Sequence, residues 1–315
     1  MFRIVTTIVV LAATGLAGAE AQAGKKVAML LFSSESRYIE GKERTLAALR
    51  QAGFVEPETT FVIENAEGNK TKAADLAKKI GATPYDLVVV FGTSATVPMA
   101  KEVKTSPIVF GHVYDPVEAK IVADWRSSGN NVTGVSNKAA MSAVLAPLKK
   151  IGTIKTLAVL YTPGEKNSEI QLKELQRAQG EAGLTVVAVP VSKAEELRAV
   201  VGEAAAGNDA LYVTGSGILG AEVAAIVDVT SKAGKPTLTH LEDQVVKGVL
   251  FGVSINSAVM GDKTGELCVR VLKGEKPSSL PILVPDKVDV VLNTKTAKAY
   301  KLPAAFMSLV TKKVE

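Results

Sequence analysis

Short apolar runs alternate with amphipathic segments along the first third of the chain. A near-continuous apolar run is typical of a strand buried in a parallel sheet, and apolar residues at helical spacing are typical of a helix that covers it. In 71–80, Ala73, Leu76, Ala77 and Ile80 fall on one side. Strands are expected at 26–32, 61–63, 87–91 and 108–110, and helices at 39–52, 71–80 and after Ser94. This order predicts a parallel sheet with helices on both faces.

A second series of the same kind follows an interrupted helical pattern at 138–151, which contains Pro147. Strands are expected at 156–161, 184–189, 210–213, 236–239 and 248–252, and helices at 167–180, 194–206 and 221–233. Two successive series of similar size predict an α/β protein with two doubly wound, Rossmann-like lobes.

The last part of the chain is expected to visit both lobes. A helix at 261–272 would return to the first lobe, and the Pro- and Ser-rich stretch 277–285 reads as a connector. A strand at 288–293 and a helix at 294–301 would rejoin the second lobe. The predicted division is residues 24–134 plus 255–285 for lobe 1 and residues 135–254 plus 286–315 for lobe 2.

The amino terminus has the pattern of a secretory signal peptide. Arg3 precedes the apolar run 4–16, and residues 19–21 and 21–23 both fit an A-x-A cleavage site. The run is short for a bilayer span, which disfavours the alternative of an uncleaved anchor. Residues 1–23 are therefore predicted to be removed near Ala21 or Ala23, leaving a soluble periplasmic protein.

Composition and charge restrict the function further. The 315 residues suffice for two core-forming units, and the net charge is +5. Lysines are spread along the chain rather than gathered in a basic stripe, so nucleic acid is not an expected partner. The single cysteine, Cys268, cannot form an internal disulfide and is expected to be a small core residue. A monomer is expected.

Polar residues stand where the predicted strands of the first lobe end, and ligands of open α/β sheets bind at such ends. The candidates are Ser33, Ser34, Ser36, Thr93, Ser94, Tyr114, Asp115, Ser136 and Asn137. Thr93 and Ser94 open a helix, whose free N–H groups suit a carboxylate, although either can simply be an N-cap. Asp115 precedes Pro116 and can equally be a turn former. Tyr114 offers a ring and a hydroxyl.

The second lobe supplies a matching set of candidates. These are Tyr161, Pro163, Asn167, Ser168, Thr214, Ser216, Glu242 and Asp243. Asn167 or Ser168 can cap the helix that follows. Glu242 and Asp243 can neutralise a ligand amino group, or can be acids that favour a helix start.

Four motifs in a fixed order carry a family resemblance: GTSA at 92–95, VYDPV at 113–117, NVTGVS at 131–136 and YTPGEKNS at 161–168. Over roughly 26–303 the chain resembles ABC-transporter solute-binding proteins of the group that includes tryptophan- and tyrosine-binding members. The resemblance implies the type I periplasmic-binding fold, with three chain crossings that form the hinge of a clamshell. It also implies a small polar ligand, such as an aromatic amino acid, and a partner permease in the inner membrane.

One departure from that group concerns the ligand. Related proteins often carry an acidic residue and an Asn where this chain has Gly215-Ser216-Gly217. If that acid holds the ligand ammonium, this protein binds a different ligand or delegates the role to Glu242 or Asp243.

The sequence carries no strong catalytic or cofactor motif. His112 and His240 have no metal-ligand cluster around them, and there is no GxSxG or GxxxxGK[ST] motif. Gly215, Gly217 and Gly220 have the GxGxxG spacing, which by itself is a weak signal for a dinucleotide. We therefore expect neither an enzyme nor a bound cofactor. Two alternatives to the transport function remain, which are an exported enzyme and a periplasmic sensor subunit that signals to a membrane kinase or cyclase.

Overall fold

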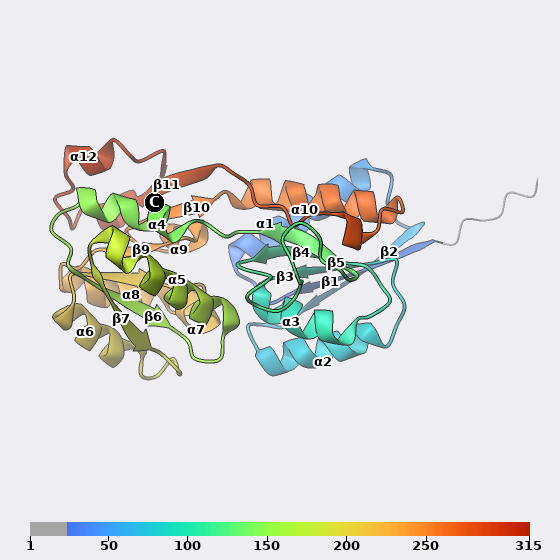
Figure 1. The fold of residues 1–315 in the computed structure, drawn as a ribbon, viewed down its shortest axis with the longest axis horizontal. Helices are drawn as coiled ribbons and strands as arrows, with labels where there is room; N and C mark the ends of the chain where they lie inside the picture. Colours follow the sequence, from blue (N-terminus) through green and yellow to red (C-terminus); the bar gives the residue numbers. More distant parts are fainter. Residues whose placement is uncertain (1–23) are drawn as a thin grey trace, which may run out of the picture.

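The computed structural model describes residues 24–315 and shows two α/β lobes side by side (Figure 1). The predicted signal peptide, residues 1–23, lies outside the described residues. The first lobe contains a five-stranded sheet in the order β2-β1-β3-β4-β5, with every pair parallel. Its strands are β1 (Lys25–Leu31), β2 (Thr59–Asn65), β3 (Leu87–Phe91), β4 (Ile108–Val113) and β5 (Val132–Ser136).

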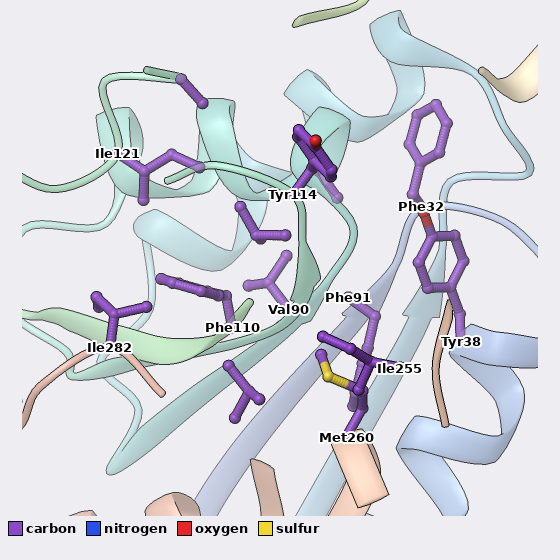
Figure 2. Packing of buried hydrophobic residues seen from close by; sticks show 14 of the residues in the cluster. Phe32, Tyr38, Val90, Phe91, Phe110, Tyr114, Ile121, Ile255, Met260 and Ile282 are labelled. Carbon is purple, nitrogen blue, oxygen red and sulfur yellow. The ribbon is translucent and has the colours of Figure 1, made fainter. Parts of the chain in front are cut away.

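Helices cover both faces of this sheet, as the alternation of apolar runs and amphipathic segments predicts. They are α1 (Ser36–Gln51), α2 (Lys70–Gly81), α3 (Thr93–Glu102) and α10 (Ser257–Leu272). All five residues of β3 are fully buried, as expected for a central strand covered on both sides. Figure 2 shows Phe91 of β3 beside Met260 of α10 in this core, with Phe32 and Tyr38 nearby.

Helix α10 belongs to the first lobe although it lies far along the sequence. It packs along α1, and two glycines permit the close approach. A Cβ at Gly265 would lie 2.5 Å from the Cβ of Ala48, and one at Gly261 would lie 2.6 Å from the Cβ of Arg44. Side chains at these positions would push the helices apart.

The second lobe holds a seven-stranded sheet in the order β12-β11-β10-β9-β8-β6-β7. Its strands are β6 (Thr156–Tyr161), β7 (Thr185–Pro190), β8 (Ala210–Val213), β9 (Thr237–Thr239), β10 (Phe251–Ile255), β11 (Val288–Asn293) and β12 (Lys312–Val314). Alternate residues of β6 face opposite layers. Leu157 and Val159 join the core that includes α5 (Lys166–Ala182), whereas Ala158 and Leu160 join the core with α6 (Leu197–Gly207) and α8 (Val223–Lys232).

The smaller elements complete this lobe and the connections. They are α4 (Met141–Leu145), η1 (Ala146–Lys150), α7 (Gly217–Ala221), α9 (Glu242–Val246), η2 (Pro277–Ser279), α11 (Thr294–Ala297) and α12 (Ala304–Met307). Within residues 24–315, three segments connect the two sheets: the one after β5, the one between β10 and α10, and the one before β11. The prediction of two doubly wound α/β lobes is confirmed.

One strand prediction needs correction, and the direction of one strand was not predicted. The strand expected at 248–252 begins only at Phe251, because Gly248 has φ +122° and the chain turns there after α9. The second sheet is not wholly parallel, since β11 pairs antiparallel with β10. Strand β10 leaves this lobe and β11 returns to it from the first lobe, so the two run in opposite directions. Elements β5, α7, α12 and β12 were not predicted.

The predicted lobe boundaries can be set beside the sheet topology. The first sheet continues to Ser136, and Val135 forms a parallel bridge with Leu283, so the chain is still beside β5 at residue 283. The division at 134, 255 and 285 stays a prediction.

Candidate ligand-binding site

A cavity lies between the lobes, where strands of both sheets end. It is lined by Arg37, Tyr38, Thr93, His112, Tyr114, Asn137, Asn167, Gln171, Gly215, His240 and Leu241. The space left between these side chains is about 10 Å³, roughly the room that one water needs. This space is too small for a solute the size of an amino acid.

The first lobe contributes the start of α3. Thr93 directly follows β3 and Gly92, and no side chain caps the helix. The first N–H groups of a helix have no partner within it, and they favour an anion. The Thr93 hydroxyl oxygen accepts the N–H of Tyr114 at 3.3 Å, so its own hydrogen is free to donate. This end of the cavity is therefore a donor surface.

The second lobe contributes two amides from α5. Asn167 and Gln171 are four residues apart and so share one face of the helix. The backbone of Gly215 orients both: its N–H donates to Gln171 Oε1 at 2.9 Å, and its carbonyl accepts from the Asn167 side-chain amide. The Asn167 Oδ1 atom is buried and has no partner among residues 24–315. A solute with an N–H or O–H group would satisfy it.

A buried ion-pair cluster links the lobes beside the cavity. Arg37 of α1 donates to Asp243 of α9 at 2.6 Å and to Glu35 at 2.6 Å. The Arg37 and Asp243 side chains are only 5% and 4% exposed. Burial alone would lower the pKa of the guanidinium, but the carboxylates of Asp243 and Glu35 raise it well above its ordinary value. Arg37 is thus a permanent cation between Glu35 of the first lobe and Asp243 of the second.

Tyr114 makes a second contact between the lobes. Its hydroxyl donates to Glu174 of α5 at 2.5 Å, and its ring lies edge-on to that of His240, with 5.1 Å between centroids. Lys138 bridges Glu174 and Asp115, both at 2.5 Å. Burial lowers the pKa of Lys138, but these two carboxylates more than offset it and the pKa is raised. Tyr114 therefore offers a solute its ring rather than its hydroxyl.

The structure places the sequence candidates in different surroundings. Thr93, Tyr114, Asn137 and Asn167 line the cavity. Ser33 and Ser34 line a separate hollow of about 440 Å³, together with residues of α7. Ser36, Ser94, Tyr161 and Pro163 line neither of these spaces.

The remaining candidates form hydrogen bonds or ion pairs within the protein, although Glu242 Oε2 and Asp243 Oδ1 are buried without a partner among residues 24–315. Asp115 accepts from the N–H groups of Val117 and Glu118 as well as from Lys138. Ser136 donates to the Tyr114 carbonyl. Ser168 bonds to Thr214, Ser216 bonds to Thr162 and caps α7, Glu242 pairs with Lys312, and Asp243 pairs with Arg37. A ligand role for these residues stays a prediction.

Sequence reasoning missed several lining residues. His112 and His240 were considered only as metal ligands, and Arg37, Tyr38, Gln171 and Leu241 were not singled out. The rule that ligands bind at strand ends could have found His240 and Leu241, which directly follow β9, and Arg37, which lies in the first turn of α1 after β1. Gln171 follows from Asn167 by helical spacing.

The comparisons with known proteins agree with the four sequence motifs. The family model described as ABC transporter substrate binding protein matches residues 26–304. The tyrosine-binding protein of Clostridioides difficile (strain R20291) is 25% identical over 260 residues, which are 82% of this chain and 75% of that protein. These matches confirm the resemblance read from the motifs.

Solved structures resemble the whole described chain. An ABC domain from Streptococcus pneumonia in complex with L-Trp has a TM-score of 0.87 at 27% identity, covering 92% of this chain and 100% of that one. The ligand-free, open structure of a substrate-binding protein with adhesive properties from Clostridium difficile has a TM-score of 0.71 at 25% identity, covering 92% and 100%. The type I periplasmic-binding fold is thereby confirmed.

Among residues 24–315 no helix is both long and apolar enough to cross a bilayer.

Proposed function

Because this chain belongs to the family of ABC transporter substrate-binding proteins, we propose that it captures a small polar solute between its lobes for an ABC importer. The family and fold are those of solute-binding proteins rather than enzymes. The observation that carries the proposal is the cavity between the lobes, which both lobes line and in which buried polar atoms lack partners.

Closure of the lobes around the solute is the proposed mechanism. The chain superimposes better on the L-Trp complex, with a TM-score of 0.87, than on the open, ligand-free structure, with 0.71. This difference supports a closed arrangement here. A solute would shift the protein toward the closed state only by binding that state more tightly than the open one.

An amino acid fits the lining best, and an aromatic one best of all. The start of α3 and the Thr93 hydroxyl suit a carboxylate, and the amide oxygens of Asn137 and Asn167 lack partners that an amino group could supply. The rings of Tyr38 and Tyr114 offer an aromatic side chain edge or face contacts. The known ligands of the relatives, tyrosine and L-Trp, are of this class.

The proposed partner is a permease in the inner membrane, and the proposed place of action is the periplasm. Family membership supports both, since substrate-binding proteins deliver solute to ABC permeases. The predicted signal peptide, residues 1–23, supports export.

The first test is a thermal-shift screen of residues 24–315, unfolded and refolded beforehand to remove any bound solute. The panel holds amino acids, nucleosides, purines and small carboxylates. A ligand at about 100 times its Kd adds about 2.7 kcal/mol to the free energy of unfolding, so Tm should rise by several degrees. We expect L-tyrosine or L-tryptophan to give the largest rise. No rise with any compound would contradict the proposed function.

The proposed binding of the solute carboxylate at the start of α3 can be tested by mutation. We expect Thr93→Ala combined with Ser94→Ala to weaken binding of the best panel compound by about tenfold, the effect of losing about 1.4 kcal/mol of hydrogen bonding. Isothermal titration calorimetry measures the change. The variant should keep its Tm within a few degrees, since neither hydroxyl caps α3 and the change removes one long hydrogen bond, from the Tyr114 N–H to the Thr93 hydroxyl. Unchanged affinity would remove this loop from the site.

A further inference from the structure

The chain has two histidines, and the fold brings both to the same cavity. His112 lies in β4 of the first lobe and His240 directly follows β9 of the second. They are 5% and 2% exposed and both line the cavity. A residue from each lobe thus contributes an imidazole to the space where the lobes meet.

Three of the four imidazole nitrogens have no hydrogen-bond partner in the described part of the chain. Both ring nitrogens of His112 are unpaired, and so is Nε2 of His240. His240 Nδ1 is 2.7 Å from the hydroxyl of Tyr212 in β8. A neutral imidazole has one N–H donor and one acceptor nitrogen, and burying either without a partner is costly. The unpaired atoms therefore point to a missing hydrogen-bonding partner in the cavity.

The backbone at His112 is shaped for this placement. The register of β4 against β5 shifts between Phe110 and Val113, and His112 has φ +56°. A register shift of this kind turns a side chain in a new direction, and positive φ is uncommon for residues other than glycine. In a regular strand, by contrast, successive side chains point to opposite faces of the sheet, and His112 would follow that alternation.

We propose that His112 and His240 recognise the solute as a pair of neutral imidazoles, one from each lobe, and that closure of the lobes requires both to be unprotonated. This inference rests on the proposed function, because it assigns roles at the same cavity. It makes these two residues determinants of specificity, since only a solute with hydrogen-bonding groups between the rings satisfies their nitrogens.

The surroundings of both rings disfavour a proton. His112 faces Tyr38 and the Arg37 cation on α1, as well as Phe91 on β3. His240, which lies between β9 and α9, faces Tyr212 of β8 and Tyr114. The two acids that open α9, Glu242 and Asp243, pair with Lys312 and Arg37. Burial, with a smaller contribution from Arg37, lowers the pKa of each histidine to about 3.

The direction of the pH effect follows from this. In an open form with exposed rings, each histidine would have a pKa of about 6.5. The open form then binds more protons than the closed form between pH 6.5 and 3, so closure is favoured above pH 6.5 and lost as the pH falls below it. Relative to pH 7.5, the cost of deprotonating each histidine at pH 5.5 should weaken binding about tenfold, hence about 100-fold for the pair.

The test measures the Kd of L-tyrosine, L-tryptophan and any other panel compound that raises Tm, from pH 7.5 to 5.5. For wild type we expect Kd to rise about 100-fold over this range. His112→Phe and His240→Phe keep a ring but lose the nitrogens. Each should weaken binding at pH 7.5 about tenfold, the effect of an unpaired hydrogen-bonding group on the solute, and each should retain only an about tenfold pH effect.

Thr45→Val is the matched control. The Thr45 hydroxyl is also buried without a partner, but it does not line the cavity, so this variant should keep the wild-type affinity and pH profile. If a histidine variant fails to fold, proton NMR of the wild type can test the inference instead. With two histidines in the chain, their Hε1 signals can be followed directly, and saturating solute should hold both in the unprotonated position at pH 5.5.

The outcomes separate this inference from the proposed function. Two results would overturn the inference alone. One is a compound that raises Tm but binds with equal affinity at pH 7.5 and 5.5, and the other is a compound that raises Tm but does not shift either histidine signal at pH 5.5. A panel in which nothing raises Tm would overturn both.

Discussion

Replacing Arg37 by methionine should weaken solute binding by two to three orders of magnitude. The change removes the cation and leaves Glu35 and Asp243 facing each other across the lobe contact. Removing one partner of a buried ion pair costs about 3–5 kcal/mol, because a buried charge is left uncompensated. Arg37 belongs to the first lobe and Asp243 to the second, so most of this cost falls on the closed state. The solute binds to that state, and its affinity should therefore fall. The Kd of the best panel compound, measured by calorimetry, checks the expectation.

Arg44→Met on the same helix is the matched control. Arg44 pairs with Asp262 at 3.7 Å, but the two side chains are 48% and 54% exposed and both belong to the first lobe. Exposed pairs contribute about 0–1 kcal/mol, so this variant should bind normally. Neutralising both acids in the Arg37→Met background, with Glu35→Gln and Asp243→Asn, should restore part of the affinity. Equal binding by Arg37→Met and Arg44→Met would exclude the ion pair as a closed-state contact.

Replacing Gly220 by leucine should abolish closure with little effect on folding. Gly220 lies in α7 of the second lobe, and the three heavy atoms nearest to an added Cβ all belong to Glu35 of the first lobe. Arg37 and Ser33 both hold the Oε2 atom of Glu35, and this restricts how far the carboxylate can move away from the added side chain. Overpacking a buried contact costs about 1–3 kcal/mol and sometimes more. We expect a loss of affinity of more than about 100-fold, at the upper end of this range.

Two measurements check the Gly220 prediction. Calorimetry gives the Kd, and small-angle X-ray scattering should show that the variant keeps the larger radius of an open form even with saturating solute. Gly202→Leu in α6 is the control, because nothing lies within 4 Å of a Cβ at that position. If Gly220→Leu compacts with solute as wild type does, then Glu35 and α7 do not meet in the closed state.

The architecture was largely predictable because each local pattern has one stable solution. An apolar run such as Leu87–Phe91 can be satisfied only by burial on both faces, and an amphipathic segment such as Lys70–Gly81 only by lying on such a sheet. The direction of β11 was not predictable in this way. The residues of a strand do not indicate whether it will run parallel or antiparallel to its neighbour in the sheet. For β11 this direction depended on the path of the chain through the first lobe.

The site was less predictable, because strand-end position alone does not decide which polar groups remain available. Thr93 and Asn167 follow strands and line the cavity, as predicted candidates. Glu242 and Asp243 occupy an equally promising position, yet one carboxylate oxygen of each pairs with Lys312 or Arg37, and neither residue lines the cavity. Those partners are 70 and 206 residues away in the sequence. No local pattern indicates such a pairing.

The sequence by itself determined the fold class, the two lobes and the family, because these follow from periodicity and from short motifs that act locally. Only the tertiary structure decided that His112 and His240 line one cavity, that Arg37 forms an ion pair between the lobes and that the Tyr114 hydroxyl donates to Glu174. The physical reason is that hydrogen bonds and ion pairs act over a few ångströms. Which groups come that close is set by the packing of the whole chain.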